Sequence, residues 1–318
     1  MSCPSGHGQD WRPSASLKAL QTRANTLATL RAFFQERGVM EVETPALAST
    51  AAAESHLEPI SCPMGYLQTS PESAMKRLLA AGSGPIYQIS HAFRSDEQGP
   101  SHNPEFTMLE WYRPGWSYHQ LRQEVLDLVQ RCMDCGPAET ITYRAAFQRY
   151  AGVDPFSVTE EQLEAEARQL GLTMESSMDR DSWLDLLMVE RVEPGLAELA
   201  RAVFIVDFPT SRAAMAQIRP DHPPVAERFE LYLDGLELAN GYQELIDPKE
   251  QRHRLMEENR QRHLRGANPL PLDERFLAAL DHGLPACAGV ALGVDRLLMA
   301  EIETKEIAQV MAFPKERA

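Results

Sequence analysis

The sequence contains no long apolar segment. No hydrophobic run approaches the ~20 residues that a membrane-spanning helix needs, and residues 1–16 are polar and contain proline in place of an apolar core. The first absence argues against an integral membrane protein, and the second argues against a secretory signal. We therefore expect a cytoplasmic protein that does not bind a membrane.

Cysteine is also scarce, with five residues in a chain of 318. An odd and sparse set does not build a disulfide framework, and it indicates a reducing compartment. Cys132 and Cys135 have the spacing of a redox or zinc pair, but they lie at the end of a helical pattern and no second pair follows. The spacing alone therefore assigns them no role.

Positive charge is in short supply. The chain has 31 Lys and Arg residues against 46 Asp and Glu, a formal net charge of −15. Proteins that grip a polynucleotide present basic patches that displace counterions from phosphates, so this balance argues against tRNA as a partner. An acidic chain can still carry one basic stripe, and residues 247–265 are the candidate. Their basic residues are Lys249, Arg252, Arg254, Arg260, Arg262 and Arg265.

Strand and helix patterns both occur along the chain. Residues 1–15 suggest a flexible tail, and the apolar spacing from Leu17 to Phe34 predicts an amphipathic helix. Residues 141–201 are acidic and helical in pattern, and we expect them to form a helical insertion beside a sheet. Two strand patterns meet at Asp234-Gly235, a sequence that favours a tight hairpin.

Residues 91–113 are the most informative stretch. Two aromatic-rich strand patterns, 86–93 and 106–112, enclose a polar loop, which predicts a hairpin with a long connection. Arg94 at the start of this loop offers a planar fork that suits a carboxylate or a phosphate. A surface hairpin with scattered charge fits the same residues, and this stretch alone leaves both interpretations open.

The returning strand carries an acid on an apolar face. Alternation places on one face the side chains of Phe106, Met108, Glu110 and Tyr112. A carboxylate in such surroundings is costly unless a cation accompanies it. We therefore treat Glu110 as a candidate site residue.

Three further stretches carry candidate residues. Glu72 follows Ser70-Pro71 at a helix start, where it serves either a substrate amine or the helix dipole. Glu230 and Glu237 fall on facing strands, where they either share a divalent cation or form a pair of exposed acids. Arg296 follows a glycine-rich strand at a helix start, a position suited to phosphate.

These stretches resemble the signature motifs of class II aminoacyl-tRNA synthetases. The second motif is matched by Phe93-Arg94-x-Asp96, by residues 102–107 (His-Asn-Pro-Glu-Phe-Thr) and by Glu110-x-Tyr112. The first is matched by the helix and the strand that ends at Pro45, and the third by residues 289–296. Residues 237–244 are similar to the lysyl branch in particular.

Two positions depart from the lysyl pattern. Ser95-Asp96 stands where that branch usually carries Asn-Glu, so the carboxylate on the adenine side is one methylene shorter. Ala291 stands where lysine-charging enzymes usually have glycine, and its methyl group should alter the floor of the amino-acid pocket. The resemblance otherwise covers about residues 15–318.

The resemblance implies a fold, an assembly and two cofactors. The fold class is α+β, a class II catalytic domain over residues 16–318 with a mainly antiparallel sheet flanked by helices and a helical insertion at about 141–201. The first motif implies a homodimer. The family uses ATP and Mg²⁺ to activate an amino acid as its adenylate.

The resemblance also implies a role for each matching residue. Arg94 would hold the substrate carboxylate and the α-phosphate, and Arg296 the distal phosphates. Asp96 and His102 would lie near the nucleotide, with Phe106 stacked on adenine. Magnesium would be held by Glu230 and Glu237. The two substrate amines and the carboxylate would be oriented by Glu72, Glu110, Tyr112, Asn240, Glu244 and the floor residue Ala291.

Within this family the chain is similar to the stand-alone lysyl-synthetase-like ligases that attach β-lysine to translation elongation factor P. Fewer than twenty residues precede the first predicted helix, so we expect no anticodon-binding domain. The expected substrates are lysine or (R)-β-lysine and a lysine side chain of elongation factor P. A basic helix at 247–265 would dock this acceptor, unless its arginines pair with Glu250, Glu257 and Glu258.

Three other functions stay open at this point. A minimal lysyl-type enzyme that acts on free tRNA should present a basic groove, which the net charge disfavours. An asparagine-forming ligase shares the fold but should lack three glutamates suited to a diamine. A catalytically inactive regulator should have lost a metal or phosphate ligand, and the sequence retains them.

Overall fold

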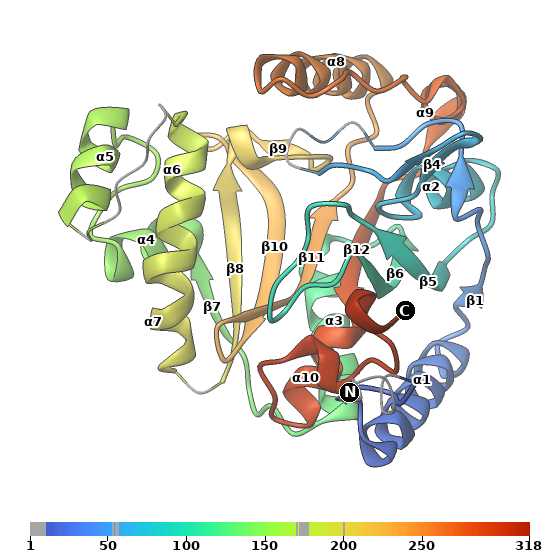
Figure 1. The fold of residues 1–318 in the computed structure, drawn as a ribbon. Helices are drawn as coiled ribbons and strands as arrows, with labels where there is room; N and C mark the ends of the chain where they lie inside the picture. Colours follow the sequence, from blue (N-terminus) through green and yellow to red (C-terminus); the bar gives the residue numbers. More distant parts are fainter. Residues whose placement is uncertain (1–10, 53, 55–56, 170, 172–177, 200) are drawn as a thin grey trace, which may run out of the picture.

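The structure is a computed structural model that describes residues 11–318 except 53, 55–56, 170, 172–177 and 200 (Figure 1). Of the predicted tail, residues 1–10 lie outside the described part. The backbone amides of Ser14 and Ala15 donate hydrogen bonds to the carbonyls of Ala312 and Met311, at 2.8 and 3.1 Å. The start of the described chain therefore lies against its C-terminal segment.

A large sheet forms the centre of the molecule, in the order β1-β5-β6-β12-β11-β10-β8-β7, with β9 paired to β10. The ladders between β5 and β8 are antiparallel, and only the outer pairs β1–β5 and β7–β8 are parallel among the described strands. This confirms the predicted α+β class. The bounds are β1 Met40–Glu41, β5 Ile86–Phe93, β6 Glu105–Pro114, β7 Glu139–Thr142, β8 Ala202–Pro209, β9 Ile218–Arg219, β10 Val225–Leu233, β11 Leu236–Gln243 and β12 Cys287–Gly293.

A small second sheet lies beside β5, in the order β2-β4-β3. Its strands are short: β2 is Leu47–Ala48, β3 is Ser61–Cys62 and β4 is Gly65–Leu67. The amide of Phe93 at the end of β5 donates to the carbonyl of Gln68, 2.9 Å away, just after β4. This contact fixes the chain that leads from β4 into the next helix.

Three helices cover one face of the large sheet (Figure 1). They are α1 (Leu17–Glu36), α3 (Tyr118–Cys132) and α10 (Val294–Glu301). Their apolar side chains pack against Leu109, Leu231 and Val290 of the strands in the largest core cluster. Since successive strand residues alternate between faces, the neighbours of these core residues point to the other side of the sheet.

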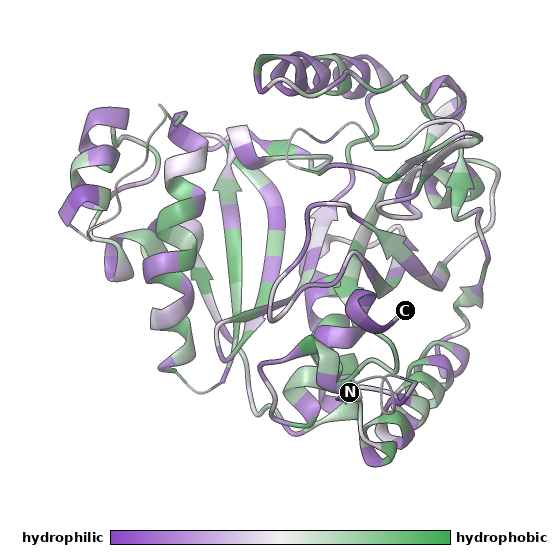
Figure 2. Ribbon diagram, in the orientation of Figure 1, coloured by the Kyte–Doolittle hydropathy of each residue, from purple (hydrophilic) through white to green (hydrophobic). Residues whose placement is uncertain are grey.

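The other helices form two groups. At one end of the sheet lie α2 (Glu72–Ala80), α8 (Pro248–Leu264) and α9 (Glu274–Gly283), and α2 and α9 share a core cluster. Figure 2 shows that α8 is mostly hydrophilic, whereas β8 is almost entirely hydrophobic. None of the helices in the described residues is long and apolar enough to cross a bilayer.

The second group occupies the predicted insertion and packs on β7 and β8 with a core of its own (Figure 1). Its helices are α4 (Tyr143–Tyr150), α5 (Glu160–Gln169), α6 (Arg180–Leu187), a π-helical turn (Met188–Val192) and α7 (Glu193–Ala197). Strand β7 starts this segment, so it is not helical throughout. Short helical turns also occur at Thr210–Arg212, Ile307–Gln309 and Lys315–Arg317.

Candidate active site

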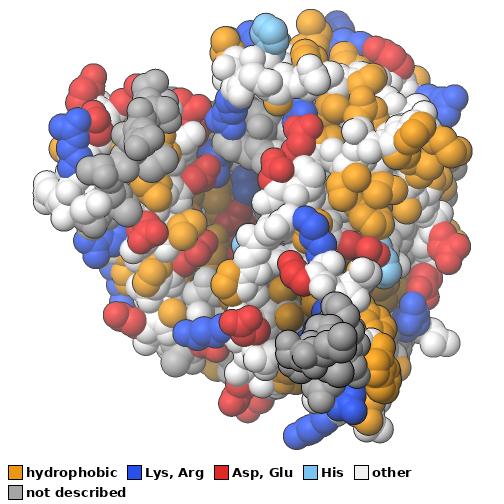
Figure 3. Space-filling model, viewed as in Figure 1, with side chains coloured by type: hydrophobic (Ala, Val, Ile, Leu, Met, Phe, Trp, Pro, Cys, Tyr) orange, Lys and Arg blue, Asp and Glu red, His pale blue; other side chains and the backbone are white. Residues whose placement is uncertain are grey.

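Strand register brings residues from four strands into one row on the open face of the sheet. Asn240 of β11 lies opposite Ala291 of β12, Ala291 lies opposite Glu110 of β6, and Glu110 lies opposite Gln88 of β5. Directly opposed residues share a face, so these four side chains project to the same side. Figure 3 shows a hollow between the insertion helices and the β5–β6 loop, with acidic and basic side chains inside it.

Two buried glutamates, one half-buried glutamate and one lysine gather around Glu110 of this row, and we call this cluster the acidic pocket. We use this name for Glu72, Glu110, Glu244 and Lys76. Lys76 is one turn beyond Glu72 on α2, and its Nζ lies 2.6 Å from Glu72 Oε1 and 2.6 Å from Glu244 Oε2. Its side chain is 1% exposed. The lysine thus joins two of the three carboxylates.

The third carboxylate has hydroxyl partners instead. Ser70 Oγ donates to Glu110 Oε2 at 2.8 Å, and the Tyr112 hydroxyl donates to Oε1 at 2.6 Å. No ion pair involves Glu110 within the described residues, although its side chain is 2% exposed. Burial and the negative charge of Glu72 raise the pKa of Glu110 to about 8. The pocket therefore holds more carboxylates than cations.

Glycine at position 289 makes space for the acidic pocket. A Cβ on Gly289 would lie 2.3 Å from Glu244 Oε1 and 2.3 Å from a ring carbon of Tyr112. Any larger residue would collide with both side chains, which explains the glycine at this point of β12. Burial raises the pKa of Glu244 to about 7, although the neighbouring Lys76 opposes this shift.

The other end of the site is rich in arginine, and we call it the phosphate end. Arg94 donates to Glu97 Oε1 at 2.8 Å, and its guanidinium carbon lies 5.0 Å from the centroid of the Phe106 ring. Arg296 donates to the Glu237 carbonyl at 2.9 Å and lies 2.7 Å from His102 Nε2. Burial and the charge of Arg296 lower the pKa of His102, which favours its neutral form.

Asp96 lies apart from this cluster. It is exposed and accepts a hydrogen bond from the neighbouring Ser95 hydroxyl at 3.0 Å. The neighbouring acid, Glu97, is the one that meets Arg94. The predicted role of Asp96 beside the nucleotide is untested and stays a prediction.

Glu230 and Glu237 lie on adjacent strands, as the hairpin predicted. Arg228 forms an ion pair with Glu230, and the Tyr232 hydroxyl donates to Glu230 Oε2 at 2.7 Å. Arg296 lies 3.4 Å from Glu237 Oε2. Burial and the charge of Glu230 raise the pKa of Glu237. Each acid is thus paired with an arginine, and the two carboxylates still lie close enough for the charge of Glu230 to act on Glu237.

These two acids suit magnesium, which prefers hard oxygen ligands and usually keeps phosphate oxygens and water in its shell. A third acid, Glu193 of α7, lies close enough that, besides burial, the charges of Glu237 and Glu230 help to raise its pKa to about 7. No cluster of three potential ligands occurs among the described residues. Oxygen atoms from a bound nucleotide would therefore have to complete the coordination.

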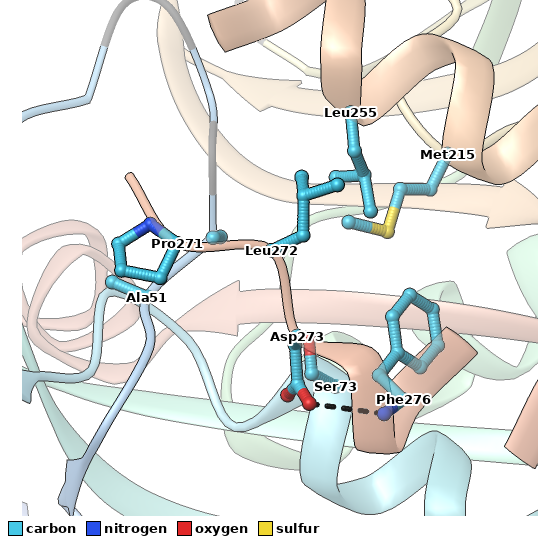
Figure 4. Close-up of a pocket in the computed structure, with 9 residues that line it drawn as sticks. Ala51, Ser73, Met215, Leu255, Pro271, Leu272, Asp273 and Phe276 are labelled. Atoms are coloured by element: carbon cyan, nitrogen blue, oxygen red, sulfur yellow. Dashed lines mark hydrogen bonds between the residues drawn. The ribbon is translucent and has the colours of Figure 1, made fainter. Parts of the chain in front are cut away.

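A small pocket behind α2 is separate from these groups (Figure 4). Its lining is mainly apolar, with Met215, Leu255 and Phe276 at its inner side, and the Asp273 carboxylate accepts from the Phe276 amide at 3.0 Å. Met215 Sδ lies 3.6 Å from Lys76 Nζ. This pocket has no cluster of charged side chains like that of the site. Met215 and Phe276 in its wall help to bury Lys76.

The basic helix α8 uses most of its arginines within the chain. Arg254 pairs with Glu250 at 2.8 Å, and Arg260 pairs with Glu257 at 2.5 Å, so two of the expected acids are partners. Arg262 is 1% exposed and donates to the carbonyl of Leu57 and the carboxylate of Glu58, at 2.8 and 2.6 Å. These pairs match the alternative to a docking surface, while docking itself stays a prediction.

Comparison with known proteins places the chain in a family. Residues 8–317 match the family model described as tRNA synthetases class II (D, K and N). The chain therefore belongs to the class II tRNA synthetases of this type, and within them to the group of elongation factor P–(R)-β-lysine ligases.

Relatives with that name cover nearly the whole chain. The ligase of Haemophilus influenzae strain PittGG is 48% identical over 97% of this chain and 98% of its own. The ligase of Proteus mirabilis is also 48% identical, with the same coverage. The ligase of Mannheimia succiniciproducens is 49% identical over 95% of this chain and 97% of its own. These matches confirm the predicted resemblance.

Three residues of the site were missed from the sequence. Lys76 is four residues after Glu72, a spacing that places both side chains on one helix face. This spacing could have predicted their contact from the sequence. Glu97 is next to Asp96, the acid that the motif pattern indicated. Gln88 is 3% exposed, and its Oε1 has no hydrogen-bond partner in the described structure. Its place beside Glu110 depends on strand register, which local patterns do not show.

Proposed function

We propose that the chain is an ATP-dependent ligase that activates (R)-β-lysine as its adenylate and transfers it to a lysine side chain of translation elongation factor P. The names of the relatives support the reaction and the acceptor. The observation that carries the substrate class is the acidic pocket, because buried carboxylates in excess of cations favour a ligand with ammonium groups. A diamine such as lysine or β-lysine meets this requirement.

The row of opposed residues orients the substrate. One ammonium group binds at Glu110, where the hydroxyls of Ser70 and Tyr112 hold the carboxylate in place. Asn240 supplies a further acceptor, since its buried Oδ1 has no partner in the described part of the chain. Ala291 lies between them and narrows the floor. The pocket thereby directs the substrate carboxylate toward the phosphate end.

Activation joins two anions. A carboxylate oxygen of the substrate attacks the α-phosphorus of ATP, the new P–O bond forms, and the bond to pyrophosphate breaks. Catalysis is therefore mainly positioning and charge stabilisation. Arg94 leaves Glu97 to hold the substrate carboxylate and the α-phosphate, and Arg296 leaves Glu237 to hold the distal phosphates. His102, being neutral, lies near the nucleotide, and Phe106 stacks on its adenine.

Glu230 and Glu237 would hold magnesium, which neutralises the phosphates and the departing pyrophosphate when it is bound. Release of Arg296 from Glu237 frees one carboxylate for this role. Arg228 stays with Glu230 and fixes its position.

Transfer completes the reaction. The neutral amine of the acceptor lysine attacks the carbonyl carbon of the adenylate, an amide bond forms, and AMP leaves. The proposal also includes a homodimer that uses α1 and the strand before Pro45, a cytoplasmic location beside the translation machinery, and no tRNA partner. Residues 16–318 act as one catalytic domain, with the insertion at about 141–201. A stable monomer in light scattering would contradict the dimer.

Pyrophosphate exchange tests the first step. Purified protein is incubated with ATP and α-lysine, each β-lysine enantiomer or aspartate, and exchange of labelled pyrophosphate into ATP is measured. We expect the fastest exchange with (R)-β-lysine and none with aspartate. Mass spectrometry of elongation factor P, with lysine tRNA as the competing acceptor, then tests transfer. Exchange with aspartate alone, or transfer to tRNA alone, would overturn the proposal.

A further inference from the structure

Resting on the proposed function, we propose that Lys76 is a positioning residue, a built-in counter-cation that occupies two carboxylates of the acidic pocket and leaves Glu110 as the acceptor for the substrate ammonium. Nothing in the chemistry of activation requires this lysine, because the reacting carboxylate and α-phosphate meet at the other end of the site. Its effect is on which amine the pocket takes and where that amine sits.

The contacts of Lys76 divide the pocket. Its ammonium lies 2.6 Å from an oxygen of Glu72 and 2.6 Å from an oxygen of Glu244, and the side chain is 1% exposed. On its other side lie Met215 Sδ at 3.6 Å and the Phe276 ring, whose centroid is 5.9 Å from Nζ. The ammonium is thus enclosed and cannot turn to solvent. Two carboxylates are thus paired with a cation before any ligand arrives.

Unlike Glu72 and Glu244, Glu110 forms no ion pair with Lys76 and is held by hydroxyl groups. Its oxygens accept hydrogen bonds from two hydroxyls, which stabilise the carboxylate without neutralising it. Opposite it in the strand register, the buried amide oxygen of Gln88 has no hydrogen-bond partner among the described residues. An ammonium group carries three donors, so a cation at Glu110 can also satisfy Gln88. Among the described residues, Glu110 is therefore the carboxylate of the pocket that has no internal cation.

Charge explains why an internal cation is useful. Without Lys76 the three carboxylates, two of them buried, would repel one another, and protons would neutralise them in place of the substrate. Lys76 opposes the upward shift that burial imposes on the pKa of Glu244, while Glu244 and Glu72 hold the pKa of Lys76 above its usual range despite burial. The titratable groups around this ion cluster are Glu72, Glu244, Glu110, Tyr112 and Cys287, and the charge of Glu72 also acts on Glu54 and Tyr242.

The test replaces Lys76 by methionine, which is of similar length and apolar, with the exposed Lys305→Met as the matched control. Pyrophosphate exchange is measured against β-lysine concentration and pH. We expect Lys76→Met to raise KM for β-lysine about tenfold or more with kcat changed far less. We also expect the pH dependence of kcat/KM to move to higher pH. Lys305→Met should match the wild type.

A second variant keeps the test decisive if Lys76→Met folds poorly. Lys76→Ala leaves a space beside Glu72 and Glu244 that a small alkylammonium ion can enter. We expect ethylammonium to lower KM for β-lysine toward the wild-type value, whereas an alcohol of equal size should not. Rescue by the alcohol as well would assign Lys76 to packing.

The outcomes separate this inference from the proposed function. If the wild type activates β-lysine but Lys76→Met has an unchanged KM and pH profile, the counter-cation role is wrong and the function stands. If the wild type does not activate β-lysine, the function is wrong. A loss of kcat with unchanged KM would also contradict a positioning role in the pocket.

Discussion

The two ends of the site balance charge in different ways. In the acidic pocket, three carboxylates, two of them buried, face one internal cation, Lys76. At the phosphate end, arginines and carboxylates meet in pairs, such as Arg94 with Glu97 and Arg296 with Glu237. A ligand must bring a cation to the acidic pocket, whereas at the phosphate end the arginines must leave their carboxylates to bind the ligand. A ligand with ammonium groups at one end and phosphates at the other therefore suits both.

The comparison also separates affinity from rate. In the proposed reaction, contacts in the acidic pocket act on the part of the substrate that does not react, so their loss should appear mainly in KM. The arginines at the phosphate end would meet charge that develops during the reaction, so their loss should appear in kcat. The predictions below use this difference.

The largest effect is expected at Arg94. Replacing Arg94 by alanine removes a cation from the developing negative charge, and loss of such a group typically lowers kcat by ~10²-fold or more. Pyrophosphate exchange at saturating β-lysine measures it. Arg168→Ala, an exposed arginine of α5 paired with Glu164, is the control. A folded Arg94→Ala variant with near wild-type exchange would refute the assignment, and Glu237→Ala should behave similarly.

Glu110→Gln should break the acidic pocket. The amide cannot neutralise an ammonium, and truncating a buried charge pair typically costs ~2–5 kcal/mol, here as a higher KM for β-lysine. Glu105→Gln on the same strand alters an exposed acid and should have little effect. Steady-state exchange kinetics distinguish KM from kcat. A change confined to kcat would contradict the difference drawn between the two ends.

The pH dependence should follow the acidic pocket. Burial and Glu72 raise the pKa of Glu110 to about 8, and burial raises that of Glu244 to about 7. Protonated carboxyls bind ammonium weakly, so kcat/KM for β-lysine should rise with pH, by up to about tenfold per unit below pH ~8. Glu110→Gln should flatten this rise. A profile that falls as the pH increases from about 6 to 8 would have the wrong sign.

Ala291→Gly sharpens the comparison within the floor of the site. Ala291 lies between Asn240 and Glu110 in the row, and its methyl group should favour the displaced amine of β-lysine over the amine of α-lysine. Removing it should shift the ratio of the two kcat/KM values toward α-lysine by ~1–3 kcal/mol. Since both substrates are measured on one preparation, errors in active concentration cancel. An unchanged ratio would leave Ala291 as packing.

The smallest effect is expected on α8. Arg252 and Arg260 are paired with Glu274 and Glu257 on the surface, so they offer little net charge to an acceptor. Charge reversal at both should slow transfer to elongation factor P by about threefold or less, with the effect shrinking as salt is added. Activation without the acceptor should be unchanged. A large, salt-sensitive loss confined to transfer would instead establish α8 as the docking surface.

Local patterns were sufficient to predict much of this structure. The strand 86–93 and the hairpin at Asp234-Gly235 were predicted from alternation and turn residues, and both turn residues have the positive φ angles, 50° and 77°, that tight hairpins require. The motif resemblance supplied candidate residues for both ends, but not Lys76, Glu97 or Gln88. What local patterns cannot provide is which strands pair and in what register.

The lack of information on strand pairing and burial explains why Gln88, Lys76 and β7 were not predicted. Gln88 joins the site because β5 pairs with β6 in one particular register, and a shift of one residue would have turned it to the core. Lys76 was overlooked because a lysine in a helix is usually solvated, and only the fold shows that it is enclosed between Glu244 and Met215. Strand β7 was missed within a segment whose composition is mainly helical.

The most direct test of the central claim uses the substrate. Two monoamine analogues of β-lysine, each lacking one of its amino groups, are compared with β-lysine in pyrophosphate exchange. A site built around buried carboxylates should reject both analogues, with kcat/KM lower by on the order of 10⁴-fold, because it leaves buried acceptors unpaired. Activation of either analogue within about tenfold of β-lysine would contradict a site that reads both amines.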